Sequence, residues 1–81
     1  MVNVIFAEHF KKVVLKLDNS IKAHLEKIIY KIKENPEMGK PMRFDRKETR
    51  EVYVSPFRLS YFYDKKQDTL YFLDFYHKDK Q

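Results

Sequence analysis

Charged and aromatic residues interrupt two apolar segments in the last third of the chain, and their types suit chemistry on an anion. Arg58 lies within one strand-like segment, and Tyr76, His77 and Lys78 lie at the end of another. Cationic groups are expensive to bury without partners, so these side chains are expected to line a surface. Such groups can hold a phosphate, stabilise developing charge and transfer protons. The pattern predicts a surface that handles an anionic ligand.

Alternation of apolar and polar side chains predicts which residues of the last two strands face the core. Odd-numbered residues from 57 to 63 and from 71 to 75 are assigned to the helix-packed face. Even-numbered residues of these segments, including Leu70 and Phe72, are assigned to the outer face. That face should then suit stacking on bases and contact with phosphates. Its polar members are Glu51, Tyr53, Arg58, Asp74, Tyr76 and Lys78.

The register of the two strands determines what Arg58 faces. Pairing Leu59 with Leu73 places Arg58 opposite Asp74. Two interpretations stay open for this pair: an ion pair that keeps an open sheet in solution, or part of an anion site. His77 has two interpretations as well, because a histidine at a strand end can be a polar cap or an acid–base group.

The composition limits the class of protein. A chain of 81 residues suits one domain, near the size at which a single core suffices. The absence of cysteine excludes thiolate metal sites, and the three histidines have no ligand-like spacing, so neither a metal nor a cofactor is expected. One glycine is too few for a phosphate-binding loop.

The charge and hydropathy predict the setting of the protein. Seventeen Lys and Arg residues against twelve Asp and Glu residues give a net charge of +5, which favours a polyanionic or acidic partner. No segment is long enough to span a bilayer, and the first residues do not resemble a secretion signal. A cytoplasmic protein without a membrane partner is therefore expected.

Two periodicities predict the elements that position these residues. Apolar residues recur at helical spacing over 7–17 and 21–34, with Asp18 as a capping residue and Asn35-Pro36 as a stop signal. They alternate in four segments: 2–6, 50–55, 57–64 and 69–77. The sequence predicts one α+β domain over 1–81: an N-terminal strand, an antiparallel helical hairpin, then a three-strand antiparallel meander with the helices on one sheet face.

The order of these elements and the segment Arg50-Glu-Val-Tyr-Val-Ser-Pro-Phe-Arg-Leu-Ser-Tyr61 resemble the RelE/ParE superfamily of bacterial and archaeal toxins. In that family a strand and a short turn precede an aromatic residue, an arginine, a hydrophobic residue and a tyrosine, here Phe57-Arg-Leu-Ser-Tyr61. Glu34-Asn-Pro36 and Gly39-Lys-Pro41 also look like these toxins. The resemblance covers essentially the whole chain. It implies the toxin of a type II toxin–antitoxin pair, with a cognate acidic antitoxin as partner.

RelE-like members cut mRNA in the ribosomal A site without metal, which implies the ribosome and mRNA as further partners. The ribose 2′-hydroxyl attacks the neighbouring phosphate, leaving a cyclic phosphate and a 5′-hydroxyl. The resemblance implies catalytic roles for Arg58 on the scissile phosphate, His77 as an acid–base group, and Lys78. Glu51 is a further catalytic candidate. The residues predicted to bind RNA are Tyr53, Tyr76, Lys80, Arg50, Lys40 and Arg43.

The chain also departs from the family pattern. Glu51 and Tyr53 stand where RelE has two lysines, Met42 stands where YoeB-like members have a glutamate base, and the sequence reaches Gln81 without the C-terminal tyrosine of RelE. Two alternatives to the ribonuclease therefore stay open: a ParE-like DNA gyrase inhibitor, and an inactive homologue that only binds its antitoxin. A ribonuclease requires Arg58, His77 and Lys78 to converge on one open pocket and the outer sheet face to be positive, whereas a gyrase inhibitor does not need this convergence. The oligomeric state stays undetermined.

Overall fold

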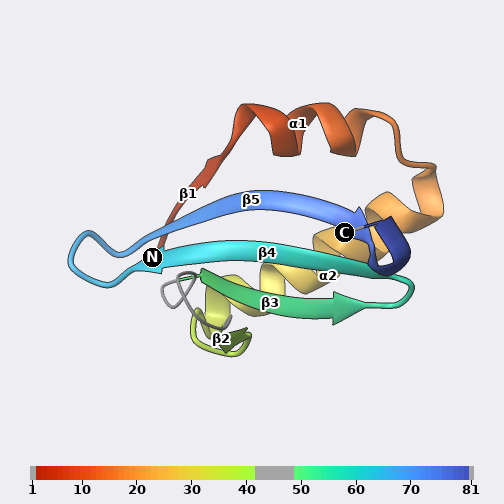
Figure 1. The fold of residues 1–81 in the computed structure, drawn as a ribbon. Coiled ribbons are helices and arrows are strands. Elements are labelled where there is room, and N and C mark those ends of the chain that lie inside the picture. Colours follow the sequence, from red (N-terminus) through yellow and green to blue (C-terminus); the bar gives the residue numbers. More distant parts are fainter. Residues whose placement is uncertain (1, 42–48, 81) are drawn as a thin grey trace.

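Two helices pack on one face of a mixed sheet (Figure 1). The computed structural model describes residues 2–41 and 49–80, apart from the Lys80 side chain. Within them the elements are β1 Asn3–Phe6, α1 Glu8–Leu15, α2 Asn19–Glu34, β2 Lys40–Pro41, β3 Thr49–Val54, β4 Phe57–Asp64, β5 Thr69–His77 and the 3-10 helix η2 Lys78–Lys80. The strand order is β1-β5-β4-β3-β2, with β1 parallel to β5 and the other pairs antiparallel. The predicted α+β architecture is confirmed.

Local signals in the sequence set the ends of the second helix. The Asp18 carboxylate accepts a hydrogen bond from the Ile21 backbone N–H at 2.9 Å and so caps the start of α2. The helix ends at Glu34, because Asn35 precedes a proline and is steered out of the helical region. In Figure 1, α1 runs alongside β5 and α2 returns behind the sheet in the opposite direction. The predicted helical hairpin is therefore present.

The core lies between the helices and the sheet. Phe10 of α1 packs against Phe72 of β5 with ring centroids 5.9 Å apart, which holds α1 near the sheet. Burying an aliphatic or aromatic side chain of this kind contributes roughly 1.5–3 kcal/mol. Both helices and the three long strands supply fully or nearly fully buried residues: Phe10, Leu25, Ile32, Val54, Leu59, Tyr61, Leu70, Phe72 and Phe75.

The first half of β5 does not have the predicted alternation. Leu70 and Phe72, which were assigned to the outer face, are fully buried in the core. Tyr71, which was assigned to the core, is only partly buried and stacks on Phe62 with ring centroids 5.7 Å apart. The assignment of residues to faces is therefore wrong for this half of the strand.

A β-bulge explains the error. Phe72 pairs with Tyr61 and Asp74 pairs with Ser60, so Leu73 is an extra residue in β5 with no Cα partner in β4. An extra residue exchanges the two faces of a strand on one side of the bulge relative to strict alternation. The predicted assignment of residues to faces therefore holds for 74–76, after the bulge, and is inverted for 70–72, before it.

Candidate functional site on the outer face of the sheet

Three strands bring Tyr53, Arg58 and Tyr76 into one row across the sheet face that points away from the helices. Tyr53 of β3 is the Cα partner of Arg58 of β4, and Arg58 is the partner of Tyr76 of β5. Because of the bulge, Leu59 pairs with Phe75. The predicted register, which placed Arg58 opposite Asp74, is therefore wrong. We call Tyr53, Arg58 and Tyr76 the outer row.

Glu51 links two members of the outer row. Its Oε1 accepts a hydrogen bond from Arg58 Nη1 at 3.0 Å, and its Oε2 accepts one from the Tyr76 hydroxyl at 2.8 Å. The side chains of Arg58 and Glu51 are 37% and 21% exposed, so water shields the ion pair in part. A carboxylate has about four acceptor positions. Glu51 therefore keeps room for a further hydrogen bond or a proton.

The guanidinium of Arg58 is not fully satisfied by the protein. Within the described residues, its Nε is buried and has no hydrogen-bond partner. Buried donors without a partner are uncommon in folded proteins. The cation is thus held at the outer face by Glu51 while part of its hydrogen-bonding capacity stays unused.

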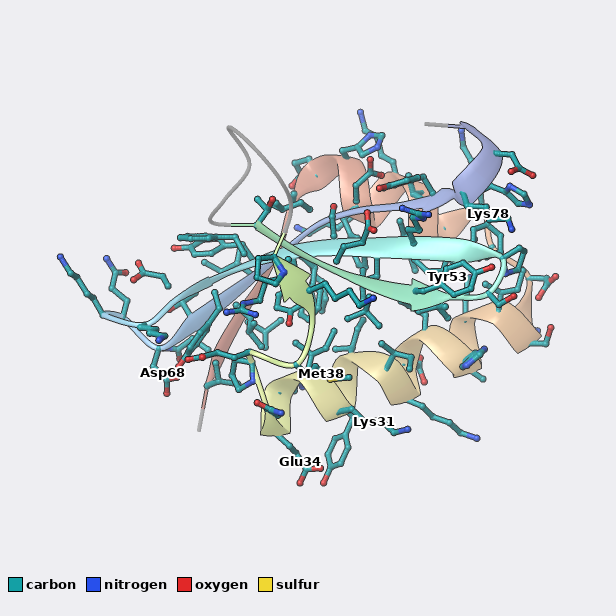
Figure 2. The ribbon with its side chains drawn as sticks, turned by 60° about the horizontal axis from the view of Figure 1, so that its bottom comes forward. Lys31, Glu34, Met38, Tyr53, Asp68 and Lys78 are labelled. Carbon is teal, nitrogen blue, oxygen red and sulfur yellow. The ribbon has the colours of Figure 1, made fainter. Side chains whose placement is uncertain are left out.

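Tyr53 and Lys78 lie at the same end of the sheet, away from Glu34 on α2 (Figure 2). The Tyr53 side chain is exposed, and its hydroxyl donates to the Ser55 hydroxyl at 3.4 Å. This hydrogen bond lowers the pKa of the Tyr53 phenol below its ordinary value, and the positive charges of Lys78 and Arg58 lower that pKa further. The site therefore makes the phenolate of Tyr53 less costly to form than that of an ordinary tyrosine.

His77 does not join the outer row. It is the Cα partner of Phe57, whose row also contains the buried Val54, so its side chain belongs to the helix-packed face. Its ring meets Phe57 edge-on with centroids 5.6 Å apart. Its Nδ1 accepts a hydrogen bond from the Asp79 backbone N–H at 3.2 Å. The structure brings the other catalytic candidates together but places His77 on the opposite face from Arg58.

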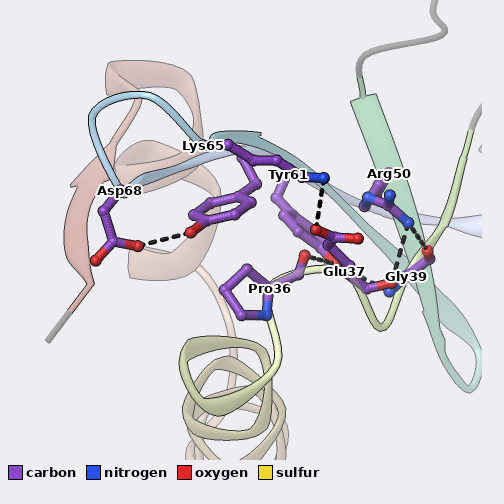
Figure 3. Close-up of polar contacts among 8 residues, drawn as sticks. Pro36, Glu37, Gly39, Arg50, Tyr61, Lys65 and Asp68 are labelled. Atoms are coloured by element: carbon purple, nitrogen blue, oxygen red, sulfur yellow. Dashed lines mark hydrogen bonds and ion pairs between the residues drawn. The ribbon is translucent and has the colours of Figure 1, made fainter.

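Arg50, a predicted RNA contact, fastens the connection that follows α2 (Figure 3). Its Nη1 donates to the carbonyls of Glu37 at 3.0 Å and Gly39 at 2.8 Å. The buried Tyr61 hydroxyl donates to the Pro36 carbonyl at 2.8 Å and accepts from the Gly39 N–H at 2.9 Å. We call Arg50, Tyr61 and the backbone of 36–39 the connection clamp. In this clamp the side chains of Arg50 and Tyr61 form hydrogen bonds with the main chain of 36–39.

The remaining predicted RNA-binding residues are placed only in part. Lys40 is exposed on β2 and is the Cα partner of Glu51, so a further cation borders the outer face. Arg43 and the side chain of Lys80 lie outside the described residues. In the part of the chain that the structure describes, no group of His, Asp and Glu side chains is arranged to hold a metal ion. None of its helices is long and apolar enough to cross a membrane.

Sequence reasoning missed an open apolar groove between α1 and α2. The groove has a volume of about 490 Å³. Leu15 lines it with 77% of its surface exposed and adjoins further apolar residues, and a contiguous exposed apolar patch of this kind is typical of an interaction site. The run Val13-Val14-Leu15 is the signal in the sequence, because one helix face cannot bury three consecutive residues. The lining is Phe6, Phe10, Val14, Leu15, Leu25 and Ile29, with Lys11, Lys22 and Glu26.

The model of the ParE toxin family of the type II toxin–antitoxin system parDE matches residues 4–81. The chain therefore belongs to this family, within the RelE/ParE superfamily that the sequence resembles. It is accordingly a toxin of the type II toxin–antitoxin class. A comparison with curated proteins found no match.

Solved structures of toxin–antitoxin complexes have the same fold. A chain of the intact E. coli RelBE complex superposes with a TM-score of 0.84 at 16% identity, over 95% of this chain and 96% of that one. A chain of the RelBE2 complex from Mycobacterium tuberculosis gives 0.85 at 24% identity, over 95% and 98%. A chain of the archaeal RelE–RelB complex from Pyrococcus horikoshii OT3 gives 0.76 at 10% identity, over 99% and 98%. At these identities the likeness concerns the fold.

Proposed function

We propose that this toxin acts in the cytoplasm by cleaving mRNA on the ribosome, with the outer face of its sheet as the active surface. The observation that supports this most is the Glu51 carboxylate in contact with both Arg58 and Tyr76, beside Tyr53 and Lys78. Cleavage of RNA without metal needs a base for the 2′-hydroxyl, cations for the charged phosphorane and an acid for the leaving oxygen. Groups of all three types occur on this one face.

The contacts suggest how these roles are divided. Glu51 takes the proton of the 2′-hydroxyl, whose oxygen attacks phosphorus. Arg58 has fixed donors that match a phosphate and stabilises the charge on the phosphorane. Lys78 adds positive charge at the same end, and Tyr76 keeps the carboxylate oriented through its hydrogen bond. Glu51 takes the place of His77 as the base, because the ring of His77 faces the helices.

Ribosome-bound mRNA tests this proposal directly. Purified toxin is added to translating ribosomes, and cleavage within the A-site codon is mapped by primer extension. Arg58→Ala and Glu51→Gln should each abolish the cuts, whereas Glu34→Gln, on the far side of α2, should cleave like the natural protein. Intact mRNA with the natural protein, or normal cleavage by Glu51→Gln, contradicts the proposal.

Inhibition of DNA gyrase is the second candidate function. Two observations favour it: the matching family is described as the ParE toxin, and His77 lies away from Arg58. A gyrase supercoiling assay with purified toxin separates the two functions. Broken DNA with intact mRNA identifies a gyrase inhibitor. Failure in both assays, together with binding of the antitoxin, identifies a homologue that only binds.

The antitoxin partner fits the groove between α1 and α2. The solved complexes contain RelB antitoxins, and an antitoxin for this chain is expected to be acidic because the toxin carries +5. An amphipathic antitoxin helix would bury its apolar face against Val14, Leu15 and Ile29. Lys11 and Lys22 would then meet its acidic residues.

Leu15→Lys tests this docking site. The substitution places a charge of the same sign as Lys11 and Lys22 in the groove, while the high exposure of Leu15 keeps the cost to folding small. We expect it to weaken binding of the cognate antitoxin by at least tenfold in calorimetry, and to leave mRNA cleavage unchanged. Tyr30→Lys, at another exposed position of α2, is the matched control and should bind normally. Equal binding by both variants places the antitoxin elsewhere.

A further inference from the structure

The outer face must supply a proton as well as accept one. When the P–O5′ bond breaks, the leaving oxygen is strongly basic and departs faster if a positioned acid protonates it. The candidates at the Lys78 end of this face are Tyr53, Tyr76 and Lys78. The inference below rests on the proposed ribonuclease function and assigns this second proton transfer.

The contacts of the three candidates differ. The Tyr76 hydroxyl already donates its proton to Glu51 at 2.8 Å, so it serves the base. Lys78 lies beyond the end of β5, in η2. Tyr53 lies within the outer row, directly beside Arg58, and its side chain is 53% exposed. Its hydroxyl donates to the Ser55 hydroxyl and also interacts with the side chain of Lys78.

The spacing of Tyr53 and Glu51 fits a reaction at one phosphate. They are two residues apart on the same face of β3, which separates their Cα atoms by about 7 Å along the strand. In-line attack places the entering and leaving oxygens on opposite sides of phosphorus. A base and an acid on the same strand, with Arg58 on the neighbouring strand, can therefore flank one phosphorane.

We infer that Tyr53 is the general acid that protonates the 5′ leaving oxygen. Glu51 removes the 2′-hydroxyl proton, the 2′-oxygen bonds to phosphorus, the P–O5′ bond breaks, and the electron pair on O5′ takes the Tyr53 proton. The products are a 2′,3′-cyclic phosphate and a 5′-hydroxyl. Water then reprotonates the phenolate and deprotonates Glu51, which restores the site. The positive charges of Lys78 and Arg58 stabilise the phenolate that forms in between.

A substrate with a different leaving group distinguishes two roles for Tyr53, that of a general acid and that of a residue that only binds RNA. The substrate is an mRNA in which sulfur replaces the 5′-bridging oxygen at the mapped cleavage position, because a thiolate leaves without a proton. We expect Tyr53→Phe to slow cleavage of the natural linkage about a hundredfold. It should cleave the sulfur linkage within a few fold of the natural protein. Glu51→Gln should lose activity on both linkages. The control is Tyr30→Phe, at an exposed position of α2, which should cleave both linkages like the natural protein.

The outcomes distinguish this inference from the proposed function. If the natural protein cleaves but Tyr53→Phe loses activity equally on both linkages, Tyr53 binds RNA and the inference is overturned. Full activity of Tyr53→Phe on the natural linkage overturns it too. If the natural protein cleaves neither linkage on the ribosome, the ribonuclease proposal itself fails, and the role of Tyr53 fails with it.

Discussion

Arg50 and Arg58 lie on neighbouring strands but serve opposite purposes. Arg50 shares the helix-packed side of β3 with Val52 and Val54, and it donates to two main-chain carbonyls of the connection clamp. Arg58 lies on the outer face, donates to one carboxylate, and keeps a buried Nε without a partner among the described residues. Arg50 therefore stabilises the fold, whereas Arg58 lies at the outer face with a donor that the described residues do not use.

The difference shows how a small domain can carry a charged site without losing its structure. Hydrogen bonds to main chain, as in the connection clamp, leave an unpaired carbonyl or N–H when they are lost, which costs about 1–3 kcal/mol for a buried group. Hydrogen bonds between partly exposed side chains, as between Arg58 and Glu51, can exchange for water or a ligand at lower cost. The clamp is therefore expected to determine stability, and the outer row to determine activity.

Exchange of each arginine for alanine tests this separation with the largest expected effect. Arg58→Ala should lower the rate of mRNA cleavage by a hundredfold or more, about 2.7 kcal/mol in transition-state stabilisation, because a preorganised cation is lost. Its melting temperature should stay close to that of the natural protein. Arg50→Ala should show the reverse pattern in the same two measurements. Loss of cleavage in a fully folded Arg50→Ala would show that both arginines serve the site.

The fold could be predicted from the sequence because its periodicities and stop signals are local. Asp18 and Asn35-Pro36 set the ends of α2, and alternation identified the strands. The bulge at Leu73 could not be predicted, because nothing in the alternating run 69–77 marks an extra residue. Its effect was confined to the first half of β5, where Tyr71 and its neighbours exchanged faces.

The site was predicted only in part, because alternation is regular at some of its residues while the bulge changes the register between β4 and β5. Tyr53, Arg58 and Tyr76 lie where alternation remains regular, so their common face followed from parity. The partner of Arg58 did not, because it depends on the register across the bulge. Residue type also could not show that Arg50 binds main chain, since its carbonyl partners belong to the connection after α2, a long-range contact.

Gly39→Ala should produce the largest loss of stability in the connection clamp. A Cβ atom at this position would lie 2.8 Å from the Tyr61 hydroxyl oxygen and 3.1 Å from the Arg50 Cβ. Relief of such contacts displaces the buried tyrosine or the backbone, which typically costs about 1–3 kcal/mol. Urea unfolding measures the change. Lys40→Ala, at the exposed neighbouring position, is the control and should unfold at nearly the same urea concentration.

Removal of single hydroxyl groups should separate the two regions more finely. Tyr61→Phe leaves the Pro36 carbonyl and the Gly39 N–H without their partner, so we expect a loss of about 1–3 kcal/mol in the free energy of unfolding. Tyr76→Phe should cost less stability, because water can reach the partly exposed Glu51. It should instead slow mRNA cleavage. Equal stability losses from the two substitutions would contradict the division between clamp and outer row.

The smallest expected effect is a difference in alkaline titration between Tyr61 and Tyr53. Burial raises the pKa of Tyr61 above the ordinary value of about 10, and the hydrogen bond with Ser55 lowers the pKa of Tyr53. The neutral Tyr61 phenol therefore contributes stability below about pH 10, and this contribution is lost as pH rises through its folded pKa. Phenolate absorbance should show that Tyr53→Phe removes an ionisation below the ordinary pKa of tyrosine and Tyr61→Phe one above it. Tyr63, whose pKa is raised by its hydrogen bond to Asp68, should also ionise late. If Tyr53 and Tyr61 ionise at the same pH, the hydrogen bond with Ser55 and the nearby cations do not lower the pKa of the Tyr53 phenol. That result would contradict the electrostatic support for proton donation by Tyr53.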